Sequence, residues 1–153
     1  MDDALDGTGD RVLVLAVASQ LTSPALIAAI ERRAAAGASA FHVVLPDPTE
    51  HAELTAGQRR KSRASGEALL RQALPRLSEA AHFPVEGSVS PRHDAMDAIE
   101  EILRQEPFDE ILLAITHHRF SERLHLDLPH RVAHLGLPVT TVFDESSSPT
   151  ADG

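Results

Sequence analysis

Residues 109–142 read DEILLAITHHRFSERLHLDLPHRVAHLGLPVTTV. The segment begins with an apolar run typical of a buried strand and continues through a stretch rich in His and Arg. A short helical pattern and a second apolar run, VTTV, follow. Two strands joined through a helix usually run parallel in one sheet. In such sheets, ligands bind in loops that leave the carboxyl ends of strands. The His- and Arg-rich stretch is therefore the candidate site.

The same alternation of apolar runs and helical patterns extends back through the chain. We expect strands at residues 11–18, 41–45, 85–89, 109–115 and 139–142. We expect helices from Ser23-Pro24 to Gly37, over residues 55–81, from Asp94, and from Asp127 or Leu128 to Gly136. Pro75 predicts a kink in the second helix, or a junction between two pieces.

This element order predicts a single α/β domain, residues 11–143. Its fold class is a doubly wound, parallel, five-stranded sheet with helices on both faces. Polar ends, residues 1–10 and 144–153, are expected to be flexible tails. Because each central strand is covered on both sides, Leu13, Val43, Ile111 and Leu113 should be buried.

The composition of the 153 residues argues against several classes of protein. The chain has no Cys, so disulfides and thiolate chemistry are excluded. No apolar run approaches the roughly 18 residues of a membrane span. The net charge is −9, all 14 basic residues lie between residues 11 and 131, and only 3% of residues are aromatic. We therefore expect a cytoplasmic protein that binds neither nucleic acid nor membrane.

Three stretches resemble the universal stress protein family: RVLVLAVAS (11–19), VEGSVSPRHDAMDAI (85–99) and RLHLDLPHRVAHLGLPVTTV (123–142). The resemblance covers residues 11–142. It implies the five-stranded architecture of that family, a role in stress responses, and a homodimer paired through the last strand, residues 139–142. A short β-branched run at a sheet edge suits such pairing.

ATP-binding members of that family carry the motif G-x2-G-x9-G-[S/T] after the fourth strand. Its four positions fall here on Ala114, His117, Asp127 and Leu128, and none keeps the motif residue. Glycines allow backbone amides to approach phosphate closely, whereas Asp127 would place a carboxylate against it. The acidic residue that ends the first strand in the family aligns with Ala18. We therefore expect a variant that does not bind ATP and has no cofactor.

Five of the nine histidines lie between residues 117 and 134. Of these, His117, His130 and His134 are the candidates for a metal site, with His118 and His125 nearby, but the sequence favours no dedicated metal site. Arg119, Arg123 and Arg131 are candidate anion contacts. We expect a surface whose affinity for anions rises as the pH falls from 8 to 6, because imidazoles gain positive charge. The competing interpretation is that these arginines pair with Glu122 and Asp127 and thereby order the loop.

Hydroxyl groups also gather at the expected carboxyl ends of strands. Ser19, Thr22, Ser23 or Ser121 could in principle form a catalytic triad with a His and Asp127. The sequence has no nucleophile elbow, however, and hydroxyls at turns usually cap helices. Asp94 and Asp97 are expected to be a helix cap and a first-turn acid. No catalytic residue is expected, and the protein is not expected to be an enzyme.

The sequence therefore favours a non-catalytic regulatory or interaction module with an unidentified protein partner. The alternative is a stress sensor that binds a nucleotide, another anion or a small molecule through the His- and Arg-rich loop.

Overall fold

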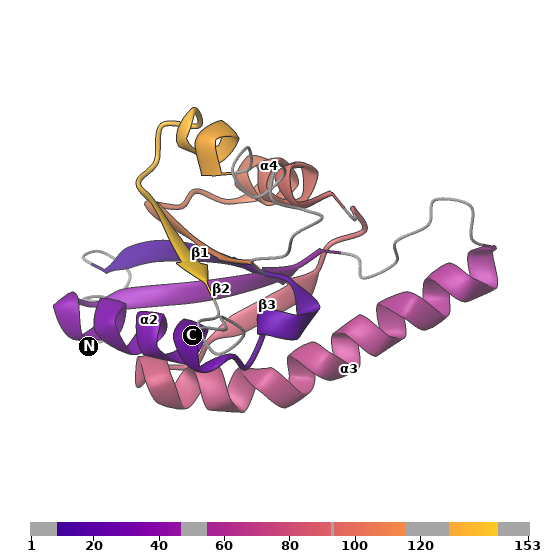
Figure 1. Ribbon diagram of the computed structural model, residues 1–153, viewed down its shortest axis with the longest axis horizontal. Coiled ribbons are helices and arrows are strands. Elements are labelled where there is room, and N and C mark those ends of the chain that lie inside the picture. The colour runs from indigo at the N-terminus through magenta and orange to yellow at the C-terminus, as the bar shows by residue number, and fades with distance from the viewer. Residues whose placement is uncertain (1–8, 47–54, 93, 116–128, 144–153) are drawn as a thin grey trace, which may run out of the picture.

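The computed structural model describes residues 9–46, 55–92, 94–115 and 129–143 (Figure 1). Five strands form one sheet in the order β3-β2-β1-β4-β5, and every neighbouring pair is parallel. The strands are β1 (Asp10–Ala16), β2 (Ser39–Leu45), β3 (Glu86–Val89), β4 (Glu110–Ile115) and β5 (Val139–Phe143). The parallel five-stranded sheet expected from the sequence is thus confirmed.

The helices lie on both faces of this sheet (Figure 1). They are α2 (Pro24–Ala36), α3 (Ala56–Ala81) and α4 (Ala95–Gln105), with a 3-10 turn η1 (Ala18–Gln20) after β1 and a helical turn at residues 129–133. Helices α2 and α3 pack on one face, and α4 and the 129–133 turn pack on the other. No helix in the described part of the chain is long and apolar enough to cross a membrane.

The central strand β1 explains why the fold has two cores. Side chains alternate between the faces of a strand, so Val12 and Val14 pack beneath α2 and α3, whereas Leu13 and Leu15 pack beneath α4. All four are fully buried, as a continuous apolar run requires. Val43, Ile111 and Leu113 are also fully buried, which confirms the core predicted from the sequence.

Helix ends follow the capping residues that the sequence contains. Ser23 is the N-cap of α2, with Pro24 as its first residue, and Asp94 caps α4 by accepting a hydrogen bond from Asp97 N–H. Thr55 and Gln58 form a capping box at the start of α3. Gly136 adopts φ of 90° after the last helical turn, a conformation that favours glycine.

The junction considered at Pro75 is wrong, because α3 runs without interruption through 26 residues. Proline has no N–H to donate, so the carbonyl of Arg71 loses its helical hydrogen bond. Both residues lie on the exposed side of the helix, where water can bond to that carbonyl. The opposite side buries Leu70, Ala73 and Leu77, and this packing holds the two halves in one helix.

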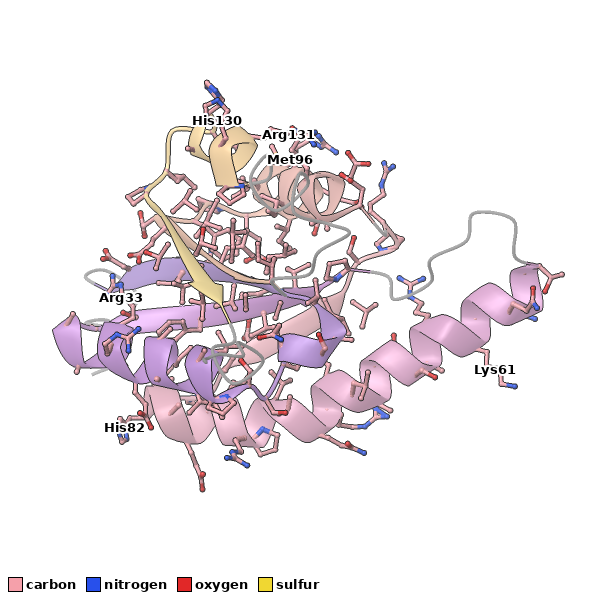
Figure 2. All side chains as sticks on the ribbon, in the orientation of Figure 1. Arg33, Lys61, His82, Met96, His130 and Arg131 are labelled. Atoms are coloured by element: carbon pink, nitrogen blue, oxygen red, sulfur yellow. The ribbon has the colours of Figure 1, made fainter. Side chains whose placement is uncertain are left out.

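Arg33 ties α2 to the amino ends of β1 and β4. Arg33, in the last turn of α2, bonds to Glu110 Oε1 at 2.8 Å and to Asp10 Oδ2 at 2.6 Å (labelled in Figure 2). Partial burial alone would lower the pKa of Arg33, but the bonds and charges of Glu110 and Asp10 raise it. This end of the sheet is thus a structural clamp, opposite the end where α/β proteins bind ligands.

Candidate functional site

The strand order places a topological switch point between β1 and β4. From β1 the chain crosses to β2 on one side, whereas β4 lies on the other side of β1. Such divergence opens a crevice at the carboxyl ends of the two strands, the usual ligand site of parallel sheets. Here the N–H of Val17 donates a hydrogen bond of 3.1 Å to the carbonyl of Ala114, so the strands remain joined up to the crevice.

The β1 side of the switch point carries no charged side chain from residue 17 to residue 20. Val17 and Ala18 are partly buried, Ser19 is exposed, and no acidic residue occurs from residue 11 to residue 30. Gln20 is only 1% exposed, and its Oε1 has no hydrogen-bond partner among the residues that the structure describes. Residues 17–20 therefore offer no carboxylate, and their polar side chains are the exposed hydroxyl of Ser19 and the buried amide of Gln20.

The β4 side begins with Ala114, which belongs to the strand itself. Ala114 is fully buried and lies in register with Ala16 of β1 and Val142 of β5. The remaining predicted residues of this loop lie outside the described residues: His117, His118, Arg119, Ser121, Glu122, Arg123, His125, Asp127 and Leu128.

The hydroxyl groups after β1 do not form a nucleophile site in the described part of the chain. Ser23 Oγ accepts a hydrogen bond of 3.1 Å from Leu26 N–H, as an N-cap does. Ser19 and Thr22 are exposed. The capping role expected for these residues is therefore confirmed for Ser23.

The helical turn before β5 brings two predicted histidines together. His130 Nε2 and His134 Nε2 lie 3.4 Å apart, and their rings meet edge to face with centroids 4.8 Å apart. Arg131, a candidate anion contact, is exposed on the same turn. Across the described ranges, His, Asp and Glu side chains form no group of three or more that could hold a metal ion.

A small cavity on the α4 face was not predicted from the sequence. It measures about 160 Å³ and lies between the ends of β2 and β3 and helix α4. Its walls include Val44, Ser88, Ser90, Glu101, Ile102 and Gln105. These residues come from three distant segments, so no local motif reveals the cavity.

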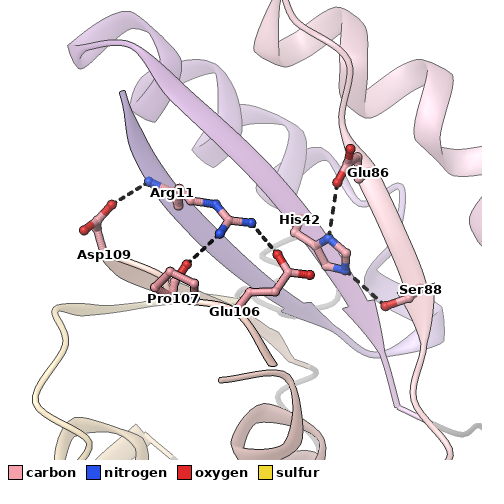
Figure 3. Close-up of polar contacts among 7 residues, drawn as sticks. All are labelled: Arg11, His42, Glu86, Ser88, Glu106, Pro107 and Asp109. Atoms are coloured by element: carbon pink, nitrogen blue, oxygen red, sulfur yellow. Dashed lines mark hydrogen bonds and ion pairs between the residues drawn. The ribbon is translucent and has the colours of Figure 1, made fainter. Parts of the chain in front are cut away.

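Ser88 connects this cavity to a polar cluster between β2 and β3 (Figure 3). Its Oγ lies 3.1 Å from His42 Nε2. On the other side of the ring, His42 Nδ1 lies 3.8 Å from Glu86 Oε1, which is too long for a hydrogen bond. Glu86 is 81% exposed and therefore does not fix the imidazole as a triad acid would. The cluster is a cross-strand polar contact beside a cavity.

The same close-up shows how Arg11 holds the segment before β4. Its guanidinium bonds to the Glu106 carboxylate and, at 2.9 Å, to the Pro107 carbonyl, and it lies 4.8 Å from the centre of the Phe108 ring (bonds in Figure 3). The hydrogen bond from Arg11 lowers the pKa of Glu106, with smaller contributions from the charges of Arg11 and His42. This cluster lies at the amino ends of the strands and is structural.

Comparison with known proteins then identifies the architecture. No protein-family model matches the chain, and no curated protein sequence does. Solved structures do match. A universal stress protein crystallised in complex with cAMP superposes with a TM-score of 0.58 at 20% identity, covering 88% of this chain and 97% of its own. A universal stress family protein from Burkholderia pseudomallei gives 0.56 at 23%, covering 88% and 96%.

The fold is that of the universal stress proteins. The expectation drawn from the sequence resemblance is thus confirmed at the level of architecture. On the universal stress protein fold, two of the five positions at which this chain departs from the ATP-binding pattern are described, Ala18 and Ala114. They lie on opposite sides of the switch point, one after β1 and one at the end of β4.

Proposed function

We propose that this chain is a non-catalytic module with the universal stress protein fold that does not bind ATP and acts through protein contacts. The proposal rests on the residues that stand at the switch point. Its β1 side offers no carboxylate near Ala18, and its β4 side begins with a fully buried Ala114 where the family motif has glycine.

Each change removes a contact that the family resemblance assigns to the nucleotide. A glycine gives the backbone the freedom to bring its amides close to a phosphate, whereas Ala114 is a strand residue whose methyl group is buried in the core beneath α2 and α3. The side chain of an acid after β1 can accept hydrogen bonds from a ligand, and the side chains of Val17 and Ala18 cannot. The sequence adds His117, Asp127 and Leu128 at the other motif positions, and the Asp127 carboxylate would repel a phosphate.

Nucleotide sensing is the competing function. One structural neighbour is a universal stress protein in complex with cAMP, so any binding test must include a cyclic nucleotide among its ligands. That neighbour shares 20% identity with this chain, and the likeness supports the fold without transferring its ligand.

Among the described residues, no strand pairs with the outer edge of β5, and this edge supports a role in protein contact. Ile111 N–H donates to the Pro138 carbonyl, and backbone groups alternate in direction along a strand. The amides of Thr140 and Val142 therefore point toward β4, whereas those of Val139 and Thr141 point outward. Outward amides of an edge strand can pair with another chain, and we propose a homodimer formed in this way.

A thermal-shift screen tests the proposal, because a ligand that binds the folded state raises its melting temperature. Mg-ATP, ADP and cAMP at 1 mM should leave the melting temperature unchanged. A rise of several degrees with Mg-ATP or cAMP would overturn the proposal and favour nucleotide sensing.

A further inference from the structure

We infer that His130 and His134 form a two-imidazole chelating site for a divalent transition metal ion, with Zn²⁺ as the best match. The inference is independent of the proposed function. It revises the expectation from sequence, which favoured anion binding in this region. The distance between the two ring nitrogens is the observation that motivates the inference.

The nitrogens already have the separation that a tetrahedral ion imposes. Zn²⁺ binds histidine nitrogen at about 2.0–2.1 Å, and tetrahedral angles then place two such ligands about 3.4 Å apart. His130 Nε2 and His134 Nε2 lie 3.4 Å apart. Two ligands at right angles, as in octahedral or square-planar sites, would lie only about 2.9 Å apart. The separation therefore matches tetrahedral coordination, and an ion would replace the hydrogen bond that joins the two rings.

The backbone holds the two histidines one turn apart on a fixed support. Residues 129–133 are helical, and the turn continues through bonds from His134 N–H to Arg131, Leu135 N–H to Val132, and Gly136 N–H to Ala133. Val132, which lies between the histidines, is fully buried in the core beneath α4. The backbone that carries the two imidazoles is thus anchored to the core.

The site is also open to an ion and to water. Both histidines are exposed, and Figure 2 shows His130 pointing away from the sheet. Among the described residues, neither imidazole is paired with a carboxylate. Arg131 is the charged side chain on the same turn. Water can complete the coordination, so the expected dissociation constant is weak, on the order of 10 μM.

The test is calorimetric titration of ZnCl₂ into the full chain, in a buffer that does not chelate zinc. We expect one ion per chain at pH 8. His130→Ala and His134→Ala should each weaken binding at least tenfold, because a single imidazole remains. Arg131→Ala, on the same turn, is the matched control and should retain or slightly improve affinity, since it removes a positive charge. Both histidines are exposed, so these variants should fold, and circular dichroism verifies it.

The pH dependence separates this site from an anion site. Protons compete with a metal ion for the imidazole nitrogens, so zinc affinity should fall from pH 8 to pH 6. Phosphate affinity at a surface of Arg and His side chains should rise over the same range. The inference is overturned if zinc does not bind at pH 8, or if binding survives in the His130→Ala, His134→Ala double variant. Phosphate binding that is lost in Arg131→Ala, without zinc binding, would establish the anion site instead.

Discussion

Ser23 Oγ accepts a hydrogen bond of 3.1 Å from the backbone N–H of Leu26, and this bond is buried. It fixes the first turn of α2 directly beside the switch point. Ser23 therefore has a structural role as a helix cap, although its position after β1 also suits a nucleophile.

Replacement of Ser23 by Ala should therefore lower the free energy of unfolding by about 1 kcal/mol, the usual cost of losing an N-cap. Urea denaturation followed by circular dichroism measures the change. Ser19→Ala is the control, because Ser19 is exposed, and its effect should stay within about 0.5 kcal/mol. Equal stability of Ser23→Ala and the wild type would show that the cap contributes nothing.

Replacement of Thr141 by Pro should abolish the proposed dimer while leaving the fold intact. The Thr141 amide points outward from β5, so proline removes a donor to a partner chain without removing a bond to β4. Light scattering at about 100 μM, in the range of weak dimer affinities, should show a dimer for the wild type and a monomer for the variant.

The opposite edge of the sheet provides a matched control for that substitution. Ser90 N–H donates to the Leu45 carbonyl, so by the same alternation Val89 N–H points outward from β3. Val89→Pro should leave the dimer unchanged if pairing uses β5. A monomeric wild type, or a dimer that only Val89→Pro disrupts, would contradict the assignment of the interface.

The Arg11–Glu106 pair predicts a pH-dependent contribution to stability. The pKa of Glu106 is lowered by Arg11, so the stabilisation is fully present above the pKa of the unfolded chain, about 4.3. It is lost as pH falls through the lower pKa of the folded state. Because both side chains are more than a third exposed, the contribution is about 0.5 kcal/mol.

Glu106→Gln should therefore reduce stability at pH 7 and have no effect near pH 3. Urea unfolding at the two pH values measures this difference. Glu79→Gln, on the exposed side of α3, is the control and should have no effect at pH 7. A Glu106→Gln variant that is equally destabilised at both pH values would show that the ion pair is not responsible.

Local patterns in the sequence predict most of the fold. The apolar run RVLVLAVA favours a buried strand, and residues 11–16 of it lie in β1. Ser23, Asp94 and Gly136 mark helix ends through their own side chains or backbone freedom. Pro75 misleads, because its cost depends on which side of α3 faces water. The cavity beside Ser88 is also missed, since its walls depend on the packing of α4 against β2 and β3.

The candidate site is only partly predictable from the sequence, because its geometry also depends on tertiary packing. The spacing of His130 and His134 predicts a shared helix face, but not the distance between their ring nitrogens, which depends on side-chain conformations. The pairing of His42 with Ser88 depends on the register of β2 and β3. The burial of Gln20 depends on how the turn after β1 packs, which a polar residue in a sequence does not reveal.

A variant that restores the family motif tests whether these positions decide nucleotide binding. It combines Ala114→Gly, His117→Gly, Asp127→Gly and Leu128→Ser. Glycine in β4 should cost about 1 kcal/mol of stability, which the domain should tolerate. If these four residues prevent nucleotide binding, the variant should gain measurable affinity for Mg-ATP.

Calorimetric titration of the wild-type protein with Mg-ATP tests the central claim most directly. Ala18 and Ala114 stand where the family pattern has an acid and a glycine. The wild type should therefore show no saturable heat at concentrations up to several hundred micromolar, on the order of 100 times a micromolar dissociation constant. Saturable binding with a dissociation constant below about 10 μM, roughly −7 kcal/mol, would contradict the account.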